Sequence, residues 1–216
     1  PATSDIIIFG GEDQDPPEYG KVFIVLKPSD ASYLTSLTKS QIVSDLKKYV
    51  VASVEPKIVD PSILFVEITS KIFYNSGMTD QRPAQIRDKT ISSVQSYIDI
   101  SDTEKFNGKF RYSKFVGVID DADPSINSNL TSVMMRKDFY PQLNSTFYYE
   151  VCFQNAFDED CDDPVLSSTG FRVTEYPNFD VYVEDRNKKI VLYRLDSVTG
   201  EKVVLDSDIG DIDYVK

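Results

Sequence analysis

Histidine and tryptophan are both absent from this chain of 216 residues. Without histidine, the chain supplies no Ser-His or Cys-His nucleophile pair, no histidine metal ligand and no imidazole acid or base. Lysine, carboxylate and tyrosine chemistry remains available. We therefore predict that the chain is not an enzyme, and we expect no catalytic residue and no cofactor.

Cysteine is also scarce, because Cys152 and Cys161 are the whole complement. A disulfide framework needs more cysteines, so we expect two free thiols, with one isolated disulfide between them left open. Two cysteines without histidine do not complete a structural zinc site. No metal site is predicted from them.

Long apolar runs are missing as well. No stretch approaches the roughly 18 apolar residues of a membrane-spanning helix. The start of the chain, Pro1–Asp5, has neither an initiator methionine nor the basic residues of a signal peptide, so we expect a piece of a longer protein. The net charge of −12 disfavours nucleic acid and anionic membranes as partners. No small-molecule substrate is predicted either.

Carboxylates are abundant, and three clusters of them are candidate sites. Asp158–Asp163 and Asp206–Asp211 could hold calcium, but the second lacks the closing glutamate of an EF-hand loop. Glu12, Asp13 and Asp15 could act on a sugar only if they were held across a cleft, and a sequence gives no such separation. We interpret all three clusters as solvated loops.

Periodicity predicts the elements of the first 140 residues. A run of apolar residues within Lys21–Pro28 predicts a strand buried on both faces. Thr38 and Gln41 have the spacing of a capping box, and Leu37 is placed to pack on Ile42 at the start of a helix. The remaining predictions are an edge strand over 52–59 interrupted by Pro56, a strand over 63–74, helices over 83–100 and 112–119, and a strand over 130–136.

The last third of the chain has a different pattern. Alternation predicts a strand over 147–153, and a hairpin follows from strands over 179–183 and 190–195 joined at 185–188. A further turn at Thr199 and Gly200 precedes a strand at 203–205. The tyrosines of this region fit either sheet packing or a protein interface.

Together these elements predict an α+β protein. Residues 1–140 read β-α-β-β-α-α-β, which suggests a split βαβ arrangement, with one mixed sheet and helices on one of its faces. Residues 141–216 read as a β-rich meander, expected to be truncated at its C-terminal end.

Three stretches of the sequence also resemble a known family. The run Phe9–Ile24, followed by Leu26–Pro28, is similar to the signature of T4-like baseplate wedge proteins in the baseplate-J-like group. Val59–Pro61 and Phe110–Pro124 resemble the same family in the same order. The signature residues, for which we expect a structural role, are Gly10, Gly11, Glu12, Asp13, Pro16, Pro17, Tyr19, Gly20 and Lys21.

The resemblance implies a structural protein of a contractile phage tail, located in the virion baseplate after assembly in the host cytoplasm. It implies self-association, first of all as a homodimer, and contacts with other wedge proteins in a ring around the central hub that rearranges on sheath contraction. Catalysis is not implied. The alternatives left open are a calcium- or carbohydrate-binding adhesion module of a phage tail and an enzyme that uses carboxylates or lysine.

Overall fold

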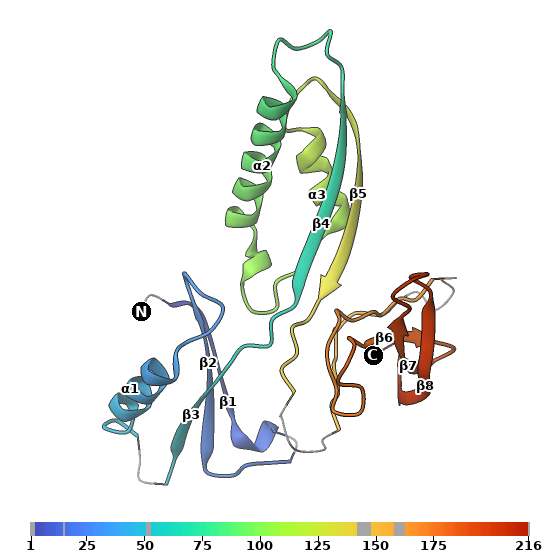
Figure 1. The fold of residues 1–216 in the computed structure, drawn as a ribbon. Coiled ribbons are helices and arrows are strands. Elements are labelled where there is room, and N and C mark those ends of the chain that lie inside the picture. Colours follow the sequence, from blue (N-terminus) through green and yellow to red (C-terminus); the bar gives the residue numbers. More distant parts are fainter. Residues whose placement is uncertain (1–2, 15, 51–52, 142–147, 158–162, 216) are drawn as a thin grey trace. The chain divides into compact units, whose positions relative to one another are not determined.

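The structure, a computed structural model, describes residues 3–14, 16–50, 53–141, 148–157 and 163–215. The chain forms two compact units, Pro1–Phe139 (unit 1) and Tyr140–Lys216 (unit 2). The elements, labelled in Figure 1 where there is room, are β1 (Thr3–Gly10), η1 (Gly11–Asp13), β2 (Lys21–Pro28), α1 (Ser36–Leu46), β3 (Glu55–Val59), β4 (Phe65–Tyr74), α2 (Pro83–Ile100), η2 (Asp102–Glu104), α3 (Tyr112–Asp120), β5 (Ile126–Arg136), β6 (Tyr182–Arg186), β7 (Lys189–Leu195) and β8 (Lys202–Asp211).

The first sheet of unit 1 has β2 at its centre. β1 pairs with β2 antiparallel, and β3 pairs with it in parallel after the α1 crossover. The four consecutive residues Phe23–Leu26 are all buried. Because successive side chains of a strand point to opposite faces, both faces of β2 are covered, as the apolar run predicts. Pro56 lies in β3 at the edge of the sheet, where its missing N–H costs no ladder bond.

The start of α1 differs from the prediction. Its N-cap is Thr35, whose side chain accepts a hydrogen bond from the Thr38 amide at 3.3 Å. Leu37 is 70% exposed, so the predicted hydrophobic contact at the helix start is wrong. Thr35 and Thr38 are both competent caps, and spacing alone does not choose between them.

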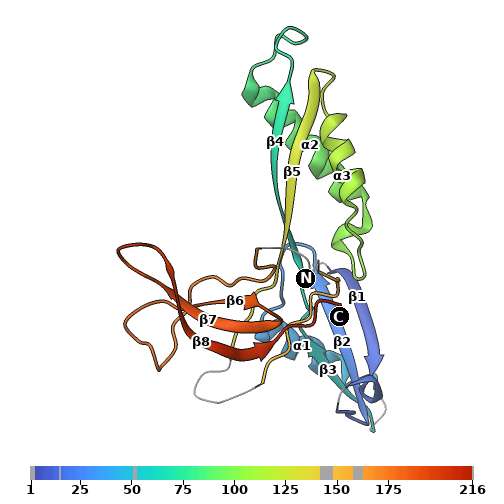
Figure 2. The same ribbon diagram turned by 90° about the vertical axis from the view of Figure 1, so that its right-hand side faces the viewer.

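The second part of unit 1 is a ribbon of two long strands with helices on one side. β4 and β5 pair antiparallel along their whole length. In both views α2 and α3 run along the same side of this ribbon (Figures 1 and 2). Its buried apolar residues are Ile86 of α2 together with Phe115 and Ile119 of α3. The predicted helix over 83–100 is confirmed with its bounds.

The α+β class is confirmed, but the single mixed sheet is not. Among the described strands, β4 joins β5 in a sheet of its own and forms no ladder with β1, β2 or β3. The register explains the difference, because β5 begins earlier than predicted, at Ile126, and offers a partner along the whole of β4. Strand patterning shows that a segment pairs, but it does not identify the partner.

Unit 2 contains the predicted meander. β6, β7 and β8 are neighbours in chain order and antiparallel. The tight turn between β6 and β7 places Asn187 and Lys188 at φ of 52° and 63°, as the common two-residue hairpins require. No helix among the described residues is long and apolar enough to cross a membrane.

The predicted strand at 147–153 is contradicted, since no strand is present at 148–157; Phe147 itself lies outside the described residues. The aromatic side chains of this stretch pack locally instead, with the Phe153 and Phe157 ring centroids 5.4 Å apart. The Phe157 amide donates to the Tyr214 carbonyl at 2.8 Å. Alternation is a local signal, whereas a strand also needs a partner edge.

Candidate functional site

The signature residues surround the connection between β1 and β2. Gly11 is buried, and its carbonyl accepts hydrogen bonds from the amides of Glu18 at 2.7 Å and Gln14 at 3.3 Å. A β-carbon on Gly11 would overlap the Glu18 carbonyl oxygen. Only glycine therefore allows the connection to fold back on itself here. Gly10 is the last residue of β1.

Gly20 and Lys21 link this connection to the sheet. Gly20 has a φ of 77°, in the region that favours glycine, and its carbonyl accepts from the Glu55 amide at 2.8 Å. This bond fastens the start of β2 to the start of β3. The close approach at Gly11 and the positive φ at Gly20 both favour glycine.

The charged residues of the signature region form ion pairs between the β1–β2 connection and the first sheet. The Lys21 ammonium lies 2.5 Å from the Glu18 carboxylate, and Lys57 lies 3.7 Å from it. The hydrogen bond from Lys21 lowers the pKa of Glu18, and Glu18 in turn raises the pKa of Lys21. Both groups therefore stay charged near neutrality and hold the loop to the sheet.

The other signature residues face solvent. Glu12, Asp13, Pro16 and Pro17 are all exposed, and Tyr19 is 80% exposed. Asp15, the third carboxylate of this cluster, lies outside the described residues. Glu12 and Asp13 are both exposed, whereas glycoside hydrolysis needs two carboxylates held across a sugar cleft.

The C-terminal acidic cluster is already paired with a lysine. The Lys189 ammonium lies 3.0 Å from Asp208 and 2.7 Å from Asp211, and both carboxylates raise its pKa. The described residues contain no group of three or more potential ligands that could hold a metal ion. Residues 158–162, including Cys161, lie outside the described part, and Cys152 is a free, half-buried thiol.

A surface that the sequence analysis did not single out lies on the β4–β5 ribbon. Its strand partners on the side away from α3 are Glu67 with Met134, Thr69 with Ser132, Lys71 with Leu130 and Phe73 with Ser128. Phe73 is 45% exposed, Leu130 68% and Met134 66%. We call this surface the open face of the ribbon. Glu67, Thr69 and Lys71 of β4 make this face partly polar, and most of the apolar residues named on it come from β5.

The helix-covered side of the ribbon has a polar centre. The Ser70 and Thr131 hydroxyls lie 2.8 Å apart, and the Tyr112 hydroxyl donates to the Thr131 carbonyl at 2.9 Å. Asn129 donates to the Val116 carbonyl at 3.3 Å. The bonds of Tyr112 and Asn129 fix α3 against β5. Tyr112 keeps half of its surface exposed while its hydroxyl makes this bond.

Two family models match unit 1. Residues 1–59 match C-terminal domain I of the baseplate structural protein gp6, and residues 62–138 match C-terminal domain III of the same protein. The chain belongs to the gp6 family of baseplate wedge proteins. The two matches meet at the connection between β3 and β4, where the first sheet gives way to the ribbon.

A relative from Enterobacteria phage T4, the baseplate wedge protein gp6, is 33% identical over 129 residues. The aligned part is 58% of this chain and 19% of the T4 protein, so the match spans about a fifth of that relative's length. The predicted family and location are confirmed, and membership makes the chain a structural component of the phage tail baseplate.

Proposed function

We propose that this chain is a non-catalytic assembly module that self-associates, first as a homodimer, and joins neighbouring wedge proteins to build the inner baseplate ring. The observation that carries the proposal is the open face of the ribbon. Apolar side chains gathered on one exposed face mark a protein contact more often than scattered ones do. Phe73, Leu130 and Met134 are exposed on this face of a long paired ribbon, where they alternate with polar residues such as Lys71 and Ser132.

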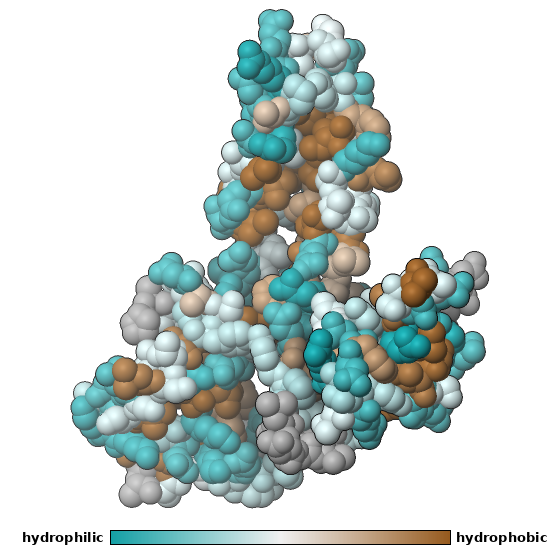
Figure 3. Space-filling model, in the orientation of Figure 1, coloured by the Kyte–Doolittle hydropathy of each residue, from teal (hydrophilic) through white to brown (hydrophobic). Residues whose placement is uncertain are grey.

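The small hydrophobic core of residues 62–138 supports the same proposal. Only Ile86, Phe115 and Ile119 are buried apolar residues among the described residues of 62–138. In Figure 3 apolar side chains, coloured brown, remain visible along the seam between α2 and the ribbon. A two-layer body that leaves so much apolar surface accessible gains stability from a partner that covers it.

We also propose that the signature residues Gly11, Gly20 and Lys21 serve the fold of the β1–β2 connection rather than a ligand. Their support is the close approach at Gly11, the positive φ at Gly20 and the Lys21–Glu18 pair. We further propose that residues 1–140 and 141–216 are separate domains. Expression of residues 1–140 alone tests this, because a separate domain unfolds cooperatively without the rest of the chain.

The test of self-association is light scattering over a wide concentration range. We expect a dimer that dissociates in the double variant Leu130→Lys with Met134→Lys, because two charges would be desolvated at the contact. The matched control is Ile100→Lys with Val198→Lys, at positions 85% and 91% exposed and outside the ribbon. A monomer at every concentration would contradict self-association, and equal dissociation of both variants would contradict the choice of surface.

A further inference from the structure

A basic segment precedes and enters α3 in this otherwise acidic chain. Residues 105–119 contain the cations Lys105, Lys109, Arg111 and Lys114 and no carboxylate, whereas the whole chain has 35 Asp and Glu against 23 Lys and Arg. Lys109, Arg111 and Lys114 are all exposed. We call residues 105–114 the basic segment.

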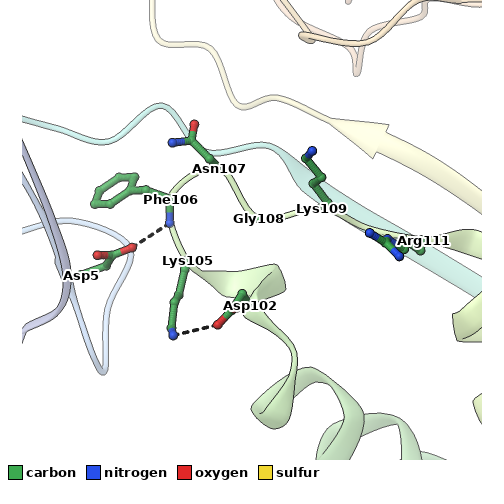
Figure 4. A pocket seen from close by; sticks show the side chains of 8 residues that line it. All are labelled: Asp5, Asp102, Lys105, Phe106, Asn107, Gly108, Lys109 and Arg111. Atoms are coloured by element: carbon green, nitrogen blue, oxygen red, sulfur yellow. Dashed lines mark hydrogen bonds and ion pairs between the residues drawn. The ribbon is translucent and has the colours of Figure 1, made fainter.

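The carboxylates nearest to this segment already have partners. Asp102 pairs with Lys105 at 2.7 Å, and Glu104 pairs with Lys27 at 3.6 Å. Asp5 accepts the Phe106 amide at 2.8 Å, a bond that lowers its pKa. Figure 4 shows Asp5, Asp102 and Lys105 held in these contacts, while Lys109 and Arg111 follow along the extended stretch before α3.

Three successive cations are therefore left without a counterion. Lys109, Arg111 and Lys114 form no ion pair within the described part of the chain. This is unusual here, because carboxylates outnumber cations and most of the other lysines and arginines are paired. Lys105, Lys109 and Arg111 also line one open hollow, together with the two engaged carboxylates Asp5 and Asp102.

We propose that the basic segment is a docking surface for a carboxylate-rich segment of another protein. A partner with clustered Asp and Glu would pair with Lys109 and Arg111, and the bidentate geometry of guanidinium and carboxylate would favour Arg111 as the anchor. Nucleic acid fits less well, because the net charge of −12 would repel a phosphate backbone outside this one segment. This surface is separate from the open face of the ribbon, so the inference goes beyond the proposed function.

The probe that tests this inference is a short fluorescein-labelled oligoglutamate peptide, titrated with the 216-residue chain at low and high salt. We expect binding at low salt that weakens as salt screens the charges. The variant Lys109→Gln with Arg111→Gln should weaken binding by about tenfold or more. Both side chains are exposed, so the fold should persist, and an unchanged circular dichroism melting curve checks this.

The matched control is Lys47→Gln with Arg82→Gln. These residues are also exposed, also form no ion pair among the described residues, and give the same change in net charge. Binding that survives in the basic-segment variant, falls equally in the control, or is absent at low salt would overturn the proposal. Equal or tighter binding of single-stranded DNA of matched charge would overturn the class of partner. Light scattering on the same samples separates these outcomes from any failure of self-association.

Discussion

The ribbon of unit 1 and the meander of unit 2 are both antiparallel sheets, yet they differ in the carboxylates that they bury. The ribbon with its helices and connections buries Ile86, Phe115 and Ile119 and one carboxylate, Asp123, whereas the meander encloses two adjacent carboxylates of one strand, Glu184 and Asp185, alongside its apolar residues. The ribbon is covered by helices, which satisfy their own backbone groups. The meander is bordered by irregular chain, whose backbone groups need partners.

The buried carboxylates supply those partners. Asp185, 6% exposed, accepts hydrogen bonds from the Leu166 amide at 2.6 Å and from the Tyr214 hydroxyl at 2.8 Å. Glu184, 1% exposed, lies 2.7 Å from Arg186 and 2.5 Å from Lys202. A sheet without helices thus uses buried charge, fully paired, to bind its loops and strands together.

Removing an apolar side chain from the helix-covered ribbon should have the largest effect. Phe115→Ala is expected to lower the free energy of unfolding by about 3–5 kcal/mol, because the ring is 3% exposed and would leave a cavity. Urea unfolding followed by tyrosine fluorescence measures this. Leu37→Ala, at 70% exposure in α1, is the control and should cost less than about 0.5 kcal/mol. Similar losses of unfolding free energy in both variants would show that Phe115 does not lie in the core of unit 1.

Removing charge from the meander should have the next largest effect. Glu184→Ala is expected to cost about 1–3 kcal/mol through lost charge-assisted hydrogen bonds. The loss is limited because Arg186 and Lys202 keep 48% and 45% of their side-chain surface exposed and can rehydrate. Hydrogen exchange should speed up in peptides from 164–215. The exposed Glu175→Ala is the matched control, and faster exchange in 62–138 would contradict the separation of the two units.

The buried carboxylate Asp123 makes the stability of unit 1 depend on pH. Hydrogen bonds from Ser125 and Lys89 hold the pKa of the Asp123 carboxyl far below its ordinary value. A lowered folded-state pKa gives stability that is present above the unfolded value and is lost as the pH falls through the folded one. Asp123→Asn should therefore lower Tm at neutral pH, and the gap to the wild type should begin to close below about pH 4.

Thermal unfolding across this pH range measures that gap. Asp30→Asn, at an exposed site, is the control and should leave the Tm profile unchanged. A gap between wild type and Asp123→Asn that stays constant down to low pH would show that the substitution acts through packing and not through charge.

The addition or removal of calcium is expected to have no effect on stability. Calcium or a chelator should leave Tm unchanged, because Lys189 already pairs with Asp208 and Asp211. A rise in Tm with calcium would favour the adhesion-module alternative. Repeating the titration with Asp208→Asn and Asp211→Asn would then show whether this cluster or another one binds the ion.

Local chemistry in the sequence determined most of the elements. Pro83 at a helix start, the apolar run in Lys21–Pro28 and the turn at 187–188 each act through their own neighbours, so their structures followed from spacing. The lack of histidine likewise disfavours imidazole-based catalysis whatever the fold. The resemblance carried by Phe9–Ile24 identified the family. Spacing and composition alone do not identify a family.

Which strands pair, and which charged side chains lack a counterion, depends on contacts that form only in the folded chain. That β4 joins β5 instead of the first sheet depends on a partner far along the chain. The same holds for Glu104, which pairs with Lys27, and for Asp5, which accepts from the Phe106 amide, while Lys109 and Arg111 keep no counterion among the described residues. Which distant residues pair depends on the balance of all possible contacts in the folded chain. A pattern along the sequence describes one segment at a time and does not identify its partner.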